Sequence, residues 1–270
     1  MPTVTTNVGA NTALRFLRIN DEMTRSSIGK LSSGSRIVKA SDDAASLAIS
    51  TNLNADVVTL KQAAVNASHG NAVVQVADGG LARIADILAR MKSLGTQSLS
   101  GSVDVTSRGY INSEFTQIRD EITSIAQQTE FNGTELLSIV ANIDFMVGRQ
   151  ATEVITVATV DATSTGLAVN ASTVDTATNA TTALTAITAA INTVNGHRAA
   201  MGSYMSRFDF RARNVDTQVE NIEAAKSSLL DTDVAAEMTR FTSAQVLMQA
   251  NVAMLAQANQ LPQNLLRLLQ

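Results

Sequence analysis

Two histidines are the first residues of this chain with the chemistry to bind a metal ion or to transfer a proton. His69 and His197 are the only histidines in the sequence. A metal site would need further His, Cys, Asp or Glu side chains at ligand spacing, and neither histidine has such a set around it. A structural or surface role is therefore predicted for both.

Adjacent carboxylates and adjacent glycines are the other two candidates. Asp42 and Asp43 follow Ser41, which can cap a helix, and acidic residues in a first turn are stabilised by the helix dipole without any catalytic role. Gly79 and Gly80 lack the preceding strand and the spacing of a phosphate-binding loop. With no cysteine present, thiolate chemistry and disulfides are excluded. The sequence predicts no catalytic, cofactor or metal site, and hence no enzyme.

The amino-acid composition indicates long helices and argues against one class of partner, nucleic acids. The chain has 270 residues, of which 45% are hydrophobic but only 3% aromatic, and its two prolines are Pro2 and Pro262. A net charge of −4 without a dense basic face argues against nucleic-acid binding. The N-terminal residues show no basic region followed by an apolar core, so no signal peptide is predicted. These features taken alone are typical of a cytoplasmic protein.

The C-terminal stretch 233–270 is a long helical pattern without charge between Arg240 and Arg267. It is not predicted to enter a membrane, because hydrocarbon would leave its many side-chain amides without partners. These amides are Gln245, Gln249, Asn251, Gln257, Asn259, Gln260, Gln263 and Asn264. Burying about ten large apolar side chains yields roughly 15 to 30 kcal/mol. Ordering ~35 residues costs about 1 to 2 kcal/mol each, so the segment needs a partner.

The N-terminal stretch carries the matching pattern. Apolar and small residues alternate at spacings of three and four in both stretches, as in a coiled-coil seam. They are Ala10, Leu14, Leu17, Asp21, Thr24, Ile28 and Leu31 at one end, and Phe241, Ala244, Met248, Asn251, Leu255 and Ala258 at the other. Two interpretations follow: a helical hairpin that closes a bundle within one chain, or helices that order only when several copies pack together.

The middle of the chain predicts a mainly α fold, a bundle of long helices with a small β-hairpin region. Heptad patterns indicate helices from Ser41 to about Gly95, over 111–125 and from Leu184 to about Leu230. A bend or local softness is expected at Gly79 and Gly80, which each cost roughly 1 kcal/mol relative to alanine. Short strands are expected at 145–150 and 153–160. Threonine dominates 151–195, which indicates a solvated face, with O-linked modification as the alternative.

Three motifs resemble bacterial flagellin, the subunit of the flagellar filament: LSSGSRIVKASDDAASLAIS at 31–50, QQTEFNGTELL at 127–137 and LAQANQLPQNLLRLLQ at 255–270. The resemblance implies an inner coiled-coil domain of terminal helices at 1–40 and 233–270. It implies a helical rod domain at 41–232 with a β-hairpin region at about 140–175. No room is left for variable outer domains, so a smooth, thin-walled filament is expected.

The resemblance also implies functional surfaces. The inner tube of the filament is expected to be built by Leu14, Leu17, Ile28, Leu31, Phe241, Leu247, Met248, Leu255 and Leu261. A possible face for an animal innate-immune receptor is formed by Arg90, Leu94 and Glu114. Ser93 stands where recognised flagellins usually carry an acidic residue, so weak recognition is expected.

The expected partners follow from the same resemblance. The chain should form a homopolymer and meet a flagellar export apparatus, an export chaperone on its C-terminal helix, a filament cap and hook-junction proteins. Export through the flagellum replaces the cytoplasmic expectation with a secreted, extracellular filament used for swimming. The alternatives are a hook-filament junction protein and, from another class, a soluble signalling coiled coil, whose charged helix edges the C-terminal stretch lacks.

Overall fold

The structure, a computed structural model, describes residues 6–268, and their side chains up to residue 260. Five helices are present in this part of the chain: α1 (Val8–Ser33), α2 (Ala44–Ser98), α3 (Val105–Gln128), α4 (Ala177–Leu230) and α5 (Val234–Leu268). Two antiparallel strand pairs lie between α3 and α4: β1 (Glu130–Phe131) with β2 (Thr134–Glu135), and β3 (Asn142–Met146) with β4 (Val154–Ala158). The predicted mainly α fold with a small hairpin region is confirmed.

The chain divides into two units. Unit 1 comprises Met1–Ala55 and Asn221–Gln270, and unit 2 comprises Asp56–Glu220. Helices α2 and α4 continue from one unit into the other. The domain boundaries at 40/41 and 232/233 therefore remain predictions.

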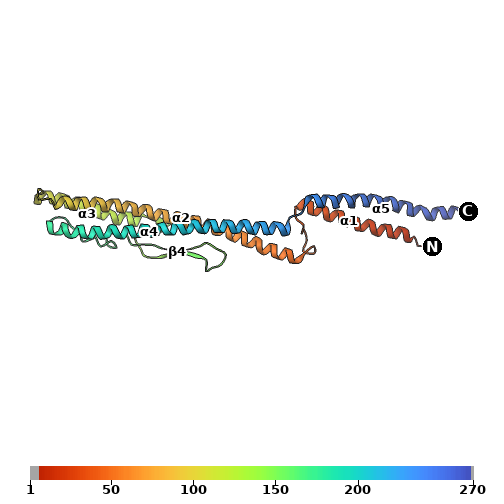
Figure 1. Ribbon diagram of the computed structural model, residues 1–270, viewed down its shortest axis with the longest axis horizontal. Coiled ribbons are helices and arrows are strands. Elements are labelled where there is room, and N and C mark those ends of the chain that lie inside the picture. Colours follow the sequence, from red (N-terminus) through yellow and green to blue (C-terminus); the bar gives the residue numbers. More distant parts are fainter. Residues whose placement is uncertain (1–5, 269–270) are drawn as a thin grey trace. The chain divides into compact units, whose positions relative to one another are not determined.

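Unit 2 contains the hydrophobic core of the protein, where α2, α3 and α4 run along one another (Figure 1). Fully buried aliphatic side chains meet there from all three helices, in the periodic positions that the heptad patterns indicate. Members of this core are Leu81, Ile84 and Leu88 from α2, Phe115 and Ile122 from α3, and Ile187 and Val194 from α4. Unit 2 thus has a continuous interior despite its low aromatic content.

The β3–β4 hairpin covers part of this core. Ile155 and Val157 of β4 are buried, as the alternation of a half-buried strand requires. The prediction for the first strand was wrong in position, since β3 ends at Met146 and residues 147–153 form the connection. The cause is Glu153, whose carboxylate accepts hydrogen bonds from the backbone N–H groups of Arg149 and Gln150 at 2.7 and 3.1 Å and closes the turn.

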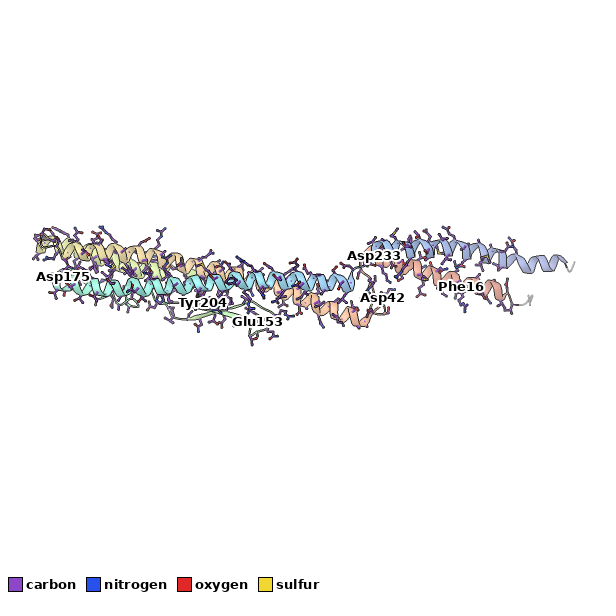
Figure 2. The ribbon with its side chains drawn as sticks, in the orientation of Figure 1. Phe16, Asp42, Glu153, Asp175, Tyr204 and Asp233 are labelled. Atoms are coloured by element: carbon purple, nitrogen blue, oxygen red, sulfur yellow. The ribbon has the colours of Figure 1, made fainter. Side chains whose placement is uncertain are left out.

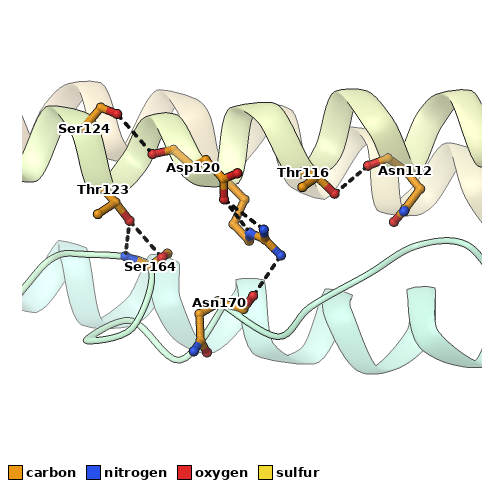
Figure 3. A network of polar contacts seen from close by, with 8 residues as sticks. Asn112, Thr116, Asp120, Thr123, Ser124, Ser164 and Asn170 are labelled. Carbon is orange, nitrogen blue, oxygen red and sulfur yellow. Dashed lines mark hydrogen bonds and ion pairs between the residues drawn. The ribbon is translucent and has the colours of Figure 1, made fainter.

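The threonine-rich segment is held by its own hydroxyl and backbone groups. Between β4 and α4, the chain contacts α3 where Thr123 shares a hydrogen bond with Ser164 at 2.8 Å, and Arg119 donates to the carbonyl of Asn170 at 2.8 Å (Figure 3). Within α4, threonine hydroxyls donate to the carbonyl one turn earlier, as Thr188 does to Leu184 at 2.8 Å. Much of the threonine content therefore serves local structure.

The helix ends follow the predicted chemistry, with one correction. Gly34 ends α1 in the left-handed conformation, with φ of +67°, as predicted. The cap of α2 is Asp43 rather than Ser41: the carboxylate of Asp43 accepts the backbone N–H of Ser46 at 3.0 Å. Asp42 instead accepts N–H bonds from Val38 and Lys39, and it fixes the connection before the helix.

Close packing explains one member of the glycine pair. Helix α2 runs without interruption through Gly79 and Gly80. A Cβ atom on Gly80 would lie 2.6 Å from Thr129 Oγ1 and 2.7 Å from Leu137 Cδ1, whereas one on Gly79 would meet nothing within 4 Å. Gly80 lets the segment after α3 approach the helix backbone.

A glycine-to-alanine comparison in α2 tests this packing. A Cβ on Gly70 would lie 2.5 Å from the ring of Phe208. Gly70→Ala should lower the free energy of unfolding by about 1 to 3 kcal/mol through overpacking. Gly79→Ala should raise it by up to about 1 kcal/mol through helix propensity. Urea denaturation followed by circular dichroism measures both, and equal stability of the two variants would contradict the packing argument.

Candidate functional site

Helices α1 and α5 form an antiparallel pair within unit 1, side by side along their lengths (Figure 1). Two side-chain hydrogen bonds define how the helices are aligned. Asn7, the cap of α1, donates to the carbonyl of Ala258 at 2.8 Å, and Ser27 donates to the carboxylate of Glu237 at 2.6 Å. The two terminal patterns found in the sequence therefore face each other within one chain.

The seam between these helices is lined largely by small and polar side chains. Its buried members are Ala10, Asn20, Thr24, Ser27, Glu237 and Ala244. Of the large apolar side chains predicted for the seam, Leu14 and Ile28 are exposed and the others are only half-buried. The half-buried ones are Leu17 and Leu31 on α1, and Phe241, Met248 and Leu255 on α5. The Nδ2 atom of Asn251 is buried without a hydrogen-bond partner in the described part of the chain, which costs about 1 to 3 kcal/mol. The pair is weakly stabilised by its own contacts.

The residues predicted to build the inner tube therefore separate into two groups. Leu17, Leu31, Phe241, Met248 and Leu255 lie at the seam, whereas Leu14, Ile28 and Leu247 point outward with exposures of 37%, 47% and 51%. The side chain of Leu261 lies outside the described residues. The outward group is left exposed by the pair, while the seam group joins α1 to α5.

Further exposed apolar side chains were missing from that prediction. They include Phe16, Ile19 and Met23 on α1 and Val246, Val252 and Met254 on α5, each more than two-fifths exposed. Figure 2 shows Phe16 on α1. Their signal in the sequence was their position beside the seam residues in the heptad, which widens the apolar stripe beyond what one partner helix covers.

A groove of about 590 Å³ lies on the surface of the pair. Leu17, Met248 and Val252 supply its apolar lining, and Arg18, Asp21 and Gln249 supply its polar lining. Helix α5 carries no charge between Arg240 and Arg267, so the charges of the groove come from α1 alone. Such a surface suits an uncharged helical partner.

Hydrogen bonds join the segment that follows α1 to the segment between α4 and α5. The backbone N–H of Arg36 donates to the carbonyl of Leu230 at 2.6 Å, and its guanidinium donates to the carbonyl of Leu229 at 2.9 Å. The N–H of Thr232 donates to the carbonyl of Gly34 at 3.1 Å. The first motif of the sequence therefore satisfies carbonyls at the end of α4, which the helix leaves without internal partners.

The acidic pair is held as two carboxylates by this local structure. Backbone N–H groups of Lys39 and Val38 keep the pKa of Asp42 below its ordinary value, and the N–H and hydroxyl of Ser46 do the same for Asp43. Asp43 caps α2 and Asp42 holds the preceding connection, and both groups are ionised at neutral pH. Neither is arranged to exchange a proton with a substrate.

The predicted receptor face lies in unit 2, and its three residues do not share one environment. Arg90 and Glu114 are exposed and form an ion pair with a shortest distance of 2.6 Å. Leu94 is 1% exposed and belongs to the core, so it has no surface to offer a receptor. Leu94 was therefore wrongly placed on that face, because the heptad of α2 turns it inward. A role for Arg90 and Glu114 stays a prediction.

Substitutions at these positions should separate core from surface. Leu94→Ala should lower the free energy of unfolding by about 2 to 5 kcal/mol, since it leaves a cavity in the core. Arg90→Ala should lower it by at most about 1 kcal/mol, because an exposed ion pair contributes little. Thermal unfolding of the two variants checks the assignment. A larger loss of unfolding free energy for Arg90→Ala than for Leu94→Ala would contradict the assignment of Leu94 to the core and Arg90 to the surface.

Neither histidine belongs to a metal site in the described part of the chain. Burial lowers the pKa of His197, and His69 lies beside a small groove lined by Phe131 and Phe145. Among residues 6–268, no group of three or more His, Asp or Glu side chains is placed to hold a metal ion. None of the described helices is both long and apolar enough to cross a membrane.

Comparison with protein families gives two matches, one at each end of the chain. Residues 4–141 match the bacterial flagellin N-terminal helical region, and residues 184–269 match the bacterial flagellin C-terminal helical region. The matched ranges include all of α1 and α5, and therefore both partners of the terminal helix pair.

Individual relatives match over nearly the whole length. The flagellin of Halalkalibacterium halodurans is 37% identical, and the flagellar filament 30.7 kDa core protein of Treponema maltophilum is 35% identical, each over 97% of this chain and 98% of the relative. The crystal structure of Bacillus cereus flagellin covers 60% of this chain and 94% of its own, with 28% identity and a TM-score of 0.52. A putative flagellar hook-associated protein of Vibrio parahaemolyticus shares the fold over 70% of this chain and all of its own, at 14% identity and a TM-score of 0.60.

Proposed function

Because the chain belongs to the bacterial flagellin family and is a subunit of the flagellar filament, we propose that the α1–α5 pair is the surface through which its copies polymerise. The full-length flagellin relatives favour this function over that of a hook-filament junction protein. Each copy presents different surfaces to different neighbours. Repeated contacts of this heterologous kind do not close, and they generate a helical filament.

The observation that carries this proposal is the contrast in burial between the two units. Among the described residues of unit 1, the fully buried hydrophobic side chains are Ala10, Ile37 and Ala244, whereas unit 2 has a continuous core. Covering an exposed large side chain yields about 1.5 to 3 kcal/mol. Several such side chains on α1 and α5 are exposed to solvent in a single copy. Packing against further copies would bury them and supply the stabilisation that one helix pair lacks.

The same surfaces support a structural role rather than catalysis. Asp43 accepts the capping hydrogen bond of α2, and Asp42 accepts hydrogen bonds from the connection before that helix. The groove on the helix pair is lined by apolar side chains, one amide and one charge of each sign. Catalysis requires groups placed to transfer protons or to stabilise a developing charge. We propose that the chain works through its contacts alone.

The further partners in this proposal follow from how a filament is made outside the cell. We propose that the chain is secreted by the flagellar export apparatus, that an export chaperone covers α5 before export, and that cap and hook-junction proteins contact the filament ends. The exposed apolar side chains of α5, such as Leu247 and Met254, are the surface that a chaperone would protect. The rotating filament serves swimming. Arg90 and Glu114 remain the proposed contact for an innate-immune receptor.

Seeded elongation tests the proposed function. Purified chain is added to short filament seeds and the products are measured by electron microscopy, beside a matched chain that lacks residues 233–270. Long filaments are expected from the full chain only, while both chains should retain the helical unfolding transition of unit 2. Elongation by the truncated chain would show that α5 is not the polymerising surface.

A further inference from the structure

The exposed side chains of the α1–α5 pair fall on two opposite sides of the seam. Each residue of an α-helix is rotated by about 100° from the one before it. Phe16 and Leu247 directly precede the seam residues Leu17 and Met248, so they project to one side of the seam. In an antiparallel pair, positions that precede seam residues on both helices share a side. Residues that follow the seam, such as Arg18, project to the other.

The first side carries a row of exposed apolar side chains, and the guanidinium of Arg15 lies over one of them, 5.3 Å from the centre of the Phe16 ring. Phe16 and Met23 on α1 are 47% and 49% exposed, and Leu247 and Met254 on α5 are 51% and 62% exposed. The residues of each helix are seven positions apart, which places them on one line along the helix surface. We name these four residues the ridge.

The second side contains the groove described above. Val252 lies four residues after Met248, and Asp21 lies four residues after Leu17, so both project to the side opposite the ridge. Arg18 and Asp21 carry opposite charges, and the α5 lining is uncharged. The groove therefore has no net charge, and it can receive an uncharged ridge without leaving an excess of one sign buried.

We propose that the ridge of one copy packs into the groove of the next. This assignment rests on the proposed function, and it names the two faces that meet. The occupant is a second copy of the same chain, because each copy has an uncharged apolar ridge on one side and a groove of matching character on the other. Apolar side chains at helical spacing entering a groove are a common mode of helix recognition.

The direction of assembly follows from this pairing. Since the two faces differ and lie on opposite sides of one helix pair, every added copy leaves one ridge and one groove free. A contact between two ridges would instead be isologous and would stop at a dimer. The ridge-to-groove contact thus accounts for open-ended growth within a single pair of helices.

Cross-linking between single-cysteine copies tests the pairing, because the chain has no cysteine of its own. Leu247→Cys marks the ridge, and Val252→Cys marks the groove. Each variant is assembled separately with an excess of wild-type chain, and a third sample contains both variants with wild-type chain. The wild-type chain maintains polymerisation in all three samples. Filaments are treated with a short flexible bismaleimide and separated by denaturing electrophoresis.

A covalent dimer is expected in the sample that contains both variants and not in either single-variant sample. Dimers from Leu247→Cys alone would show ridge against ridge and would overturn the proposal. Absence of dimers from the mixed filaments would also overturn it. These outcomes differ from a failure of the proposed function, because in that case the wild-type chain would not elongate on seeds.

Discussion

Leu255→Asp is expected to abolish filament elongation while unit 2 stays folded. Leu255 lies half-buried at the seam of α5 with α1, within one turn of Ala258, to which Asn7 donates its hydrogen bond. An aspartate there must be taken out of water without a partner or the helices must separate, and an uncompensated buried charge costs about 3 to 5 kcal/mol. The few buried contacts of the seam are too weak to offset this free-energy cost. Electron microscopy after seeding measures elongation, and circular dichroism measures the helices of unit 2.

A matched control places the same charge on the same helix. Gln257 is exposed, and it lies on the side of α5 that faces away from the seam. Gln257→Asp should therefore preserve the α1–α5 pairing. Pairing is measured by adding Gly9→Cys and Ala258→Cys, since a Cβ at Gly9 would lie 4.0 Å from that of Ala258, within the disulfide range. The disulfide should form with Gln257→Asp and not with Leu255→Asp. Normal filaments from Leu255→Asp would show that the α1–α5 seam is not required for assembly.

Phe208→Ala should cause the largest loss of stability in unit 2. Phe208 is 1% exposed on α4, packs directly against Gly70 of α2, and meets Phe145 of β3 edge to face with ring centroids 5.5 Å apart. Truncation leaves a cavity opposite a glycine that has no side chain to fill it. The free energy of unfolding should fall by about 3 to 5 kcal/mol. Urea denaturation followed by circular dichroism measures this loss.

Phe210 is the control for that substitution, two residues along the same helix. It is 71% exposed, so Phe210→Ala should change the free energy of unfolding by no more than about 0.5 kcal/mol. The two variants remove the same side chain and differ in its surroundings. Similar losses from both would mean that the Phe208 contacts with Gly70 and Phe145 do not stabilise unit 2.

The sequence alone determined the helices and their inward faces. Because apolar side chains repeat every three or four residues, the periods of α2, α3 and α4 select core residues such as Leu81, Phe115 and Ile187 without knowledge of the fold. Gly34 likewise indicated the end of α1, since few other residues adopt its left-handed backbone. The uncharged length of α5 indicated a need for partners. These features are local or periodic, so the order of residues contains them.

Only the tertiary structure decided which apolar side chains are covered by the chain itself. The heptad treats Leu94 and Leu14 alike as apolar, yet Leu94 is buried among three helices while Leu14 remains on the surface of a single pair. The contact of Gly70 with Phe208 joins residues 138 positions apart, and no spacing along the chain encodes it. Burial depends on how many elements surround a helix. That number is fixed when distant segments pack, which is why the groove and the ridge became visible only in the folded pair.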